Sequence, residues 1–111
     1  MTASTDVPDD PIVGAVDATD PYLISLDGEV DMARAAELVA CVEGFKGSRN
    51  VDVRVDMAGV TFMDSTGLSA LAHLRSIAAE RGGSAVLVRP PTGVIKLLQI
   101  VAFDSVFTIE K

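Results

Sequence analysis

Two adjacent hydroxyl residues stand in the most informative stretch of this sequence, Asp64-Ser65-Thr66-Gly67-Leu68. This stretch follows a strand-like apolar run and opens a segment with helical spacing, so it marks the point where a strand turns into a helix. The free amides at a helix N-terminus tolerate negative charge, so a phosphate on Ser65 would leave the helix intact. The predicted chemistry is therefore reversible phosphorylation. The alternative is that Ser65 and Thr66 only cap the helix, and spacing alone favours the cap.

A second group of candidate residues lies upstream, in the run L-D-G-E-V-D at residues 26–31. Gly28 permits left-handed backbone geometry and marks a turn after a strand, with Asp27 and Asp31 on either side of it. Functional loops gather at strand ends in open α/β sheets. If the two loops share one edge of the sheet, carboxylates lie near the Ser65 hydroxyl.

The elements that must position these two loops follow from the hydrophobic pattern. Alternation or apolar runs predict strands, three- and four-residue spacing predicts helices, and Gly59 falls in the connection after the second main strand. The predicted strands cover residues 22–26, 51–56 and 85–88, with weaker ones at 12–17 and 106–109, and the predicted helices cover residues 31–45, 65–81 and 94–101. This order predicts a single α/β domain with a mixed, partly parallel sheet of four to five strands covered by helices. Residues 1–11 are expected to be a flexible acidic tail, and residues 12–111 the domain.

Composition and charge narrow the function classes. The 111 residues suffice for one core, and a hydrophobic content of 49% argues against disorder. Residues 1–33 carry eight acidic residues and no Lys or Arg, and the chain has a net charge of −7. This charge disfavours nucleic acids and anionic membranes as partners. It also favours a monomer in solution. No apolar run is long enough to span a membrane, and the N-terminus does not resemble a secretory signal. One cysteine suits a reducing compartment, so a cytoplasmic location is expected.

The remaining chemically active side chains support no catalytic, metal or cofactor site. Cys41 lies among apolar residues of the first predicted helix and is expected to pack there, although a redox role stays open. A small hydrolase would need a base beside Ser65. The only histidine, His73, lies two helical turns further on, about 12 Å along the axis. We therefore expect a binding protein and not an enzyme.

The ordered set of motifs resembles a known family. The run L-x-G-E-V-D, an alternating strand, the run F-M-D-S-T-G-L opening a helix, and R-G-G before a strand together resemble a STAS domain. More narrowly, they resemble the stand-alone bacterial anti-sigma-factor antagonists, over about residues 12–110. Two positions depart from that pattern: Ser69 and Ala102 stand where many antagonists have glycine.

The resemblance implies a non-enzymatic switch protein. In this family an ATP-dependent serine kinase, the anti-sigma factor, binds the unphosphorylated antagonist and releases its sigma factor. The kinase can phosphorylate the antagonist and so inactivate it, and a metal-dependent serine phosphatase resets it. Carried onto this sequence, the phosphoacceptor is Ser65. The expected partner-binding residues are Asp27, Glu29, Asp31, Met63, Asp64, Ser65, Thr66 and Gly67, and Phe62 is a further apolar candidate. The alternative is a STAS adaptor of another complex, such as a stressosome or a lipid-transport ATPase, that is not switched by phosphorylation.

Overall fold

Four parallel strands form one sheet in the computed structural model, which describes residues 21–111. The strands are β1 (Tyr22–Val30), β2 (Val53–Met63), β3 (Ala85–Val88) and β4 (Thr108–Glu110), in the spatial order β1-β2-β3-β4. Every pairing between them is parallel. The predicted α/β class is therefore confirmed. The tail predicted for residues 1–11 and the strand predicted for residues 12–17 lie outside the described residues.

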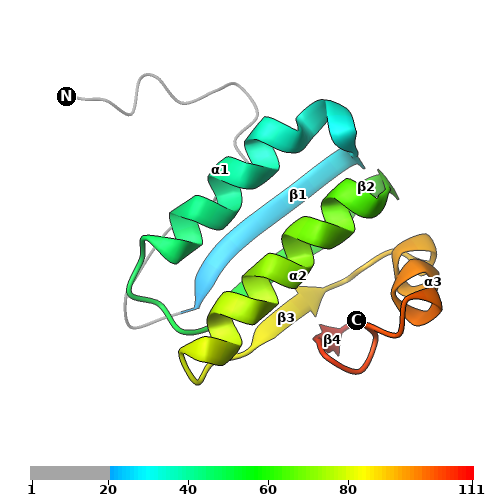
Figure 1. Cartoon of the computed structure of the whole chain (residues 1–111). Coiled ribbons are helices and arrows are strands. Elements are labelled where there is room, and N and C mark those ends of the chain that lie inside the picture. Colours follow the sequence, from blue (N-terminus) through cyan, green and yellow to red (C-terminus); the bar gives the residue numbers. More distant parts are fainter. Residues whose placement is uncertain (1–20) are drawn as a thin grey trace.

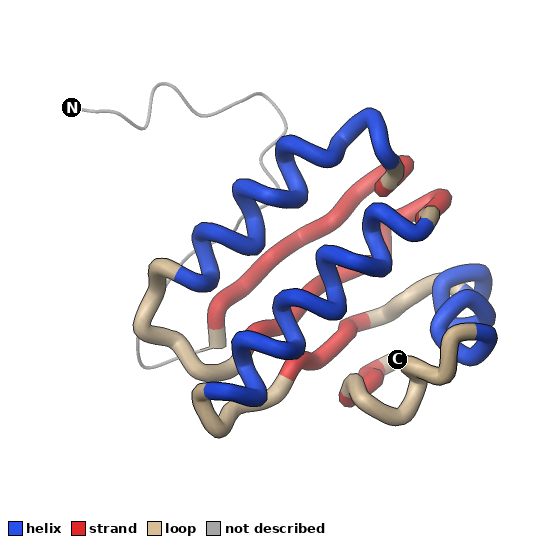
Figure 2. The backbone as a smooth tube through the Cα atoms, in the orientation of Figure 1, coloured by secondary structure: helices blue, strands red, loops and turns tan. Residues whose placement is uncertain are grey.

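A helix connects each strand to the next, as parallel pairing requires. A short 3-10 turn, η2 (Met32–Arg34), leads into α1 (Ala35–Lys46); α2 (Ser65–Glu80) and α3 (Thr92–Ile100) follow the second and third strands. Figure 1 shows α1 and α2 side by side over one face of the sheet, and Figure 2 shows the same arrangement by element type. The carboxyl ends of β1 and β2, where η2 and α2 begin, therefore lie at one edge.

The core lies between the sheet and the α1–α2 layer. Side chains alternate along β1, where Tyr22, Ile24 and Leu26 are buried and the residues between them are exposed. With so few aromatic residues, aliphatic side chains fill most of this space. The buried contributions from the two helices are Leu38, Cys41, Phe45, Leu68, Ala70, Leu71, Leu74 and Ala78. This packing fixes α1 and α2 relative to the strand ends that carry the candidate residues.

Two strand boundaries differ from the sequence-based prediction. β1 continues past Gly28 to Val30, and the register with β2 shifts on both sides of Gly28, whose φ is +66°. The predicted turn is thus a bulge inside a longer strand. Gly59 was predicted to lie in a connection and instead lies within β2, opposite Asp27. A Cβ at Gly59 would overlap the Asp27 carboxylate, so the glycine accommodates a side chain that crosses from β1.

The end of α3 contains a strained residue at the position where the sequence departs from the family pattern. Ala102 has a φ of +61°, in the left-handed region that glycine adopts most easily. The Phe103 amide donates to the Leu98 carbonyl at 2.8 Å, and the Ala102 amide donates to the Gln99 carbonyl at 3.1 Å. These bonds close the helix in the usual glycine-dependent way, with alanine in the glycine position.

Replacing Ala102 with glycine is expected to stabilise the domain by about 1 kcal/mol, because it removes the left-handed strain. The free energy of unfolding in urea measures this effect. Ala40→Gly is the matched control, since Ala40 is an exposed residue within α1, and there the same change should cost about 1 kcal/mol. A loss of stability at both positions would contradict the prediction.

Candidate functional site

The carboxylate of Asp64 joins the two loops that the sequence singled out. One oxygen, Oδ1, accepts the Thr66 amide at 2.8 Å, and the other, Oδ2, accepts the Met32 amide at 3.3 Å. The Asp64 amide in turn donates to the Val30 carbonyl at 3.2 Å. The loop after β1 and the loop after β2 therefore meet at one edge of the sheet, which the sequence had left open.

Ser65 is the first residue of α2, and its side chain is exposed. Asp64 has extended backbone geometry and caps the helix through the Thr66 amide, so neither Ser65 nor Thr66 is the N-cap. Within residues 21–111, the Ser65 hydroxyl takes part in no hydrogen bond. The hydroxyl is free for modification, and the capping hypothesis for Ser65 and Thr66 is wrong because Asp64 performs that task.

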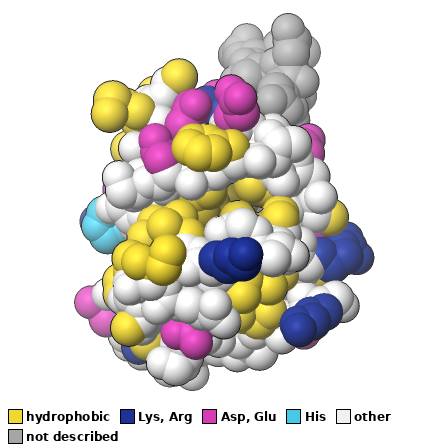
Figure 3. All heavy atoms as spheres, turned by 90° about the vertical axis from the view of Figure 1, so that its right-hand side faces the viewer, with side chains coloured by type: hydrophobic (Ala, Val, Ile, Leu, Met, Phe, Trp, Pro, Cys, Tyr) yellow, Lys and Arg dark blue, Asp and Glu magenta, His cyan; other side chains and the backbone are white. Residues whose placement is uncertain are grey.

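Acidic residues stand on the end of β1 and on the two loops that meet beside Ser65. Asp27 and Glu29 are exposed, and Asp31 is half-buried because its carboxylate accepts the Ala33 amide at 3.1 Å and caps η2. Figure 3 shows acidic side chains gathered at the upper end of this side of the molecule. A charged group added at Ser65 would enter a region that is already anionic.

Arg34 holds the bulged end of β1 in place, a role that sequence reasoning missed. Its guanidinium donates to the Asp27 carbonyl at 2.6 Å and to the Glu29 carbonyl at 3.4 Å. It also forms a two-pronged ion pair with Glu37, with both N···O distances at 3.2 Å. The available signal was its position as the first cation after eight acids.

Gly67 lets α2 begin directly against the ends of β1 and β2. A Cβ there would lie 2.8 Å from Met63 Cγ, 2.8 Å from Val30 Cγ1 and 3.0 Å from the Val30 carbonyl oxygen. Met63 itself is buried, whereas its neighbour Phe62 is 52% exposed. Gly67 and Met63 therefore support the site from the protein interior. Phe62 is the apolar residue that is exposed to a partner.

The predicted partner-binding residues thus fall into three groups by accessibility, all at one edge. Asp27, Glu29 and Ser65 are exposed; Asp31, Asp64 and Thr66 are half-buried; Met63 and Gly67 are buried. Met32, at the start of η2, is 74% exposed and extends the apolar part of this surface. The arrangement suits recognition by another protein, because free charges and apolar groups lie together on rigid elements.

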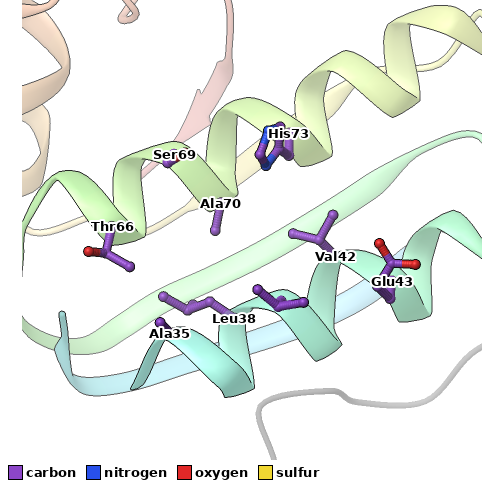
Figure 4. Close-up of a pocket in the computed structure, with 9 residues that line it drawn as sticks. Ala35, Leu38, Val42, Glu43, Thr66, Ser69, Ala70 and His73 are labelled. Atoms are coloured by element: carbon purple, nitrogen blue, oxygen red, sulfur yellow. The ribbon is translucent and has the colours of Figure 1, made fainter. Parts of the chain in front are cut away.

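A groove between α1 and α2 begins beside the site. Figure 4 shows side chains from both helices around it, with Thr66 toward one end and His73 and Glu43 toward the other. Its volume is about 420 Å³, and its walls are mainly apolar. His73 is exposed, two turns along α2 from Ser65, so the groove places it away from the hydroxyl.

Cys41 is buried in the core from α1, with 2% of its surface exposed. Burial raises the pKa of its thiol from the ordinary value of 9.0 to about 12. The nucleophilic thiolate is therefore scarce at neutral pH. The folded state therefore holds the thiol proton more tightly than the unfolded state does. The contribution of this difference to the free energy of unfolding is fully present below pH 9 and is lost as the pH rises toward 12.

Cys41 is therefore expected to resist alkylation by iodoacetamide in the folded protein at neutral pH and to react fully once the chain is unfolded. Mass spectrometry of the intact chain gives the extent of modification. The control is Val39→Cys in a Cys41→Ala background, because Val39 is 61% exposed on the same helix and its replacement should react at once. Rapid native labelling of Cys41 would reopen the redox role.

In the described part of the chain, no group of three or more His, Cys, Asp or Glu side chains is arranged to hold a metal ion. Across the same residues, none of the helices combines the length and apolar character needed to cross a membrane.

Comparison with known proteins gives consistent similarities. Residues 15–109 match the family described as Mlab, STAS domain. The anti-sigma-B factor antagonists of Listeria monocytogenes and Listeria innocua are each 25% identical over 92 residues, covering 83% of this chain and 81% of theirs.

Two solved structures share the fold. The anti-sigma factor antagonist SpoIIAA, described in its unphosphorylated form, has a TM-score of 0.75 at 17% identity, covering 89% of this chain and 86% of its own. A Thermotoga maritima protein provisionally described as an anti-sigma factor antagonist has a TM-score of 0.78 at 18% identity, covering 89% and 84%. At these identities the two structures establish the fold alone.

Proposed function

Because this chain belongs to the STAS domain family, we propose that it is an anti-sigma-factor antagonist whose binding face surrounds Ser65. In this proposal the unmodified protein binds a serine-kinase anti-sigma factor and frees the sigma factor. Phosphorylation of Ser65 by that kinase ends the interaction, and a serine phosphatase restores it. The protein acts by binding, without catalysis of its own, and does so in the cytoplasm.

The main observation behind this proposal is that Asp64, and not Ser65, forms the structural hydrogen bonds at the start of α2. Asp64 caps α2 and ties it to η2, while the adjacent Ser65 hydroxyl is exposed and unbonded. A structural serine at a helix start would use its oxygen for capping. A kinase substrate instead needs a reachable hydroxyl whose modification does not break a structural bond, and Ser65 meets both conditions.

The surrounding charge supplies the switch. A phosphate adds a charge of about −1.5 to −2 at neutral pH, and here it would be attached directly after Asp64, at the edge where the loop with Asp31 meets α2. Close approach of an acidic or nucleotide-bearing partner would then cost a few kcal/mol. The phosphate also lies at the N-terminus of α2, where the helix dipole favours it, so the fold is retained. The switch acts on the interface.

The relatives support the same assignment. Both Listeria proteins carry the name anti-sigma-B factor antagonist and align over most of their length. The matched family description names Mlab and no antagonist, however, and this favours keeping an unswitched STAS adaptor as the second candidate. The two candidates differ in one respect that is accessible to experiment: only the first requires Ser65 to remain unmodified for binding.

A pull-down from the native cell extract with wild-type, Ser65→Ala and Ser65→Glu baits tests the proposal, with mass spectrometry to identify the bound proteins. We expect a protein with a kinase-type ATPase domain to be captured by the first two baits and lost with the third. The purified partner should then phosphorylate wild type but not Ser65→Ala in the presence of ATP. Equal capture of one partner by all three baits would support the unswitched adaptor instead.

A further inference from the structure

β2 is longer than its neighbour on one side, so part of its edge has no strand partner. β1 accompanies β2 as far as Met63, but β3 pairs only with residues 53–56 and ends at Val88. Figure 1 shows the chain leaving β3 and turning toward α3 while β2 runs on. In residues 21–111, no backbone hydrogen bond joins residues 59–63 to β3, to α3 or to the connection between them, whereas the Ala58 amide already donates to Asp56 Oδ1 at 3.0 Å.

An unpaired strand edge displays amide and carbonyl groups that another strand can bind. Residues 59–63 span about 15 Å at the usual rise for a strand. β1 already uses the opposite edge of this segment. The free edge is therefore long enough to pair with several residues of an extended chain.

An apolar groove lies beside this edge, between β2 and α3. Its volume is about 390 Å³. Val60, Met63 and Val94 are buried beneath it, whereas Phe62 and Ile100 at its margins are 52% and 80% exposed. Figure 3 looks onto this side of the molecule and shows hydrophobic side chains gathered across it. Phe62 and Ile100 thus leave exposed apolar surface on both margins of the groove, and no other described residue covers it.

Charge further defines what the groove accepts. Lys96 is the one charged residue among the described residues that line it. The chain as a whole carries a net charge of −7, so this cation creates a local exception on an acidic molecule. A bound segment with one acidic residue beside Lys96 would be complementary there. Further acidic residues would be repelled by the net negative charge of the rest of the protein, so the segment should otherwise be uncharged.

We propose that this groove binds an extended, apolar segment of a partner protein that carries one acidic residue and adds to the free edge of β2 as a further strand. Backbone hydrogen bonds to residues 59–63 would supply general affinity, and alternate side chains of the segment would enter the apolar groove. An acidic side chain of the segment would pair with Lys96. The proposed contact does not involve the Ser65 hydroxyl, so its test does not depend on whether the phosphorylation switch exists.

The test is a titration of the ¹⁵N-labelled full chain with a synthetic peptide that alternates isoleucine with threonine and carries one glutamate. We expect chemical-shift changes confined to residues 59–63 and 93–100, with slower hydrogen exchange of the β2 edge amides in the complex. The same peptide with alternate backbone nitrogens methylated cannot complete the strand pairing and should bind at least about tenfold more weakly. Lys96→Glu should weaken the unmodified peptide by about fivefold, and Lys111→Glu, outside the groove, should leave it unchanged.

Three results would overturn the proposal. The first is an absence of shifts at the groove, and the second is equal binding of the methylated peptide, because strand addition requires its amides. The third is strong exchange protection of the β2 edge in the free protein. That protection would mean that a second copy, or residues of the same chain, already occupies the groove; its loss on dilution or in Ile100→Asp would identify a second copy.

Discussion

Gly67→Ala is expected to destabilise the domain by about 2 kcal/mol. The added Cβ would lie within 3.0 Å of Met63 Cγ, Val30 Cγ1 and the Val30 carbonyl oxygen. Met63 can adjust because its side chain is flexible, but the β-branched Val30 and its backbone cannot. Overpacking of this severity costs about 3 kcal/mol, of which the better helix propensity of alanine returns about 1 kcal/mol. The remainder is a large fraction of the stability of a small domain.

Gly93→Ala is the matched control for this prediction. Gly93 also lies in the first turn of a helix, α3, but a Cβ there would meet no atom within 4 Å. The same substitution should therefore stabilise the domain by about 0.5–1 kcal/mol. Unfolding in urea, followed by circular dichroism, gives both free energies. If the two variants changed stability in the same direction, close approach of α2 to the strand ends would not be what constrains position 67.

The importance of position 67 was partly visible in the sequence. A glycine directly after a hydroxyl pair is compatible with a close backbone approach, and parallel topology allows the loops after β1 and β2 to meet at one edge. The sequence did not reveal that Val30 and Met63 are the residues approached, because those contacts join segments far apart in the chain. Periodicity identifies which face of an element is buried but not which residues meet across the interface.

The errors at Gly28, Gly59 and Ser65 share a physical origin. A glycine is compatible with a turn, a bulge or a close approach, and only the pairing of β1 with β2 decides among them. Serine, threonine and aspartate are all good N-caps, so the sequence D-S-T leaves the capping residue open. The Asp64 carboxylate performs this task because the Met32 amide offers its second oxygen another bond. Arg34 was missed because two of the groups that it binds are backbone carbonyls, which residue types do not reveal.

Phosphorylation of Ser65 is expected to weaken partner binding by about 100-fold or more while leaving the fold intact. Near-contact of like charges costs several kcal/mol, and about 2.7 kcal/mol corresponds to 100-fold in affinity. The unfolding free energy should stay within about 1 kcal/mol of the unmodified value or rise, because the phosphate meets the N-terminus of α2. Loss of binding together with unchanged stability separates an interface switch from local unfolding.

The affinity is measured by isothermal titration calorimetry with the partner captured by the wild-type bait, using phosphorylated protein, Ser65→Glu and Ser65→Ala. Ser65→Glu, with about half the added charge, should lose less affinity than the phosphorylated form, and Ser65→Ala should bind as wild type. Ser76→Glu is the control for charge alone, since Ser76 is exposed on the same helix far from the acidic edge and should not alter binding. Equal losses for Ser76→Glu and Ser65→Glu would show that net charge acts without a local site. If the phosphorylated protein bound as tightly as the unmodified one, the exposed hydroxyl of Ser65 would have no switching role, and the acidic edge would be left as a constitutive contact surface.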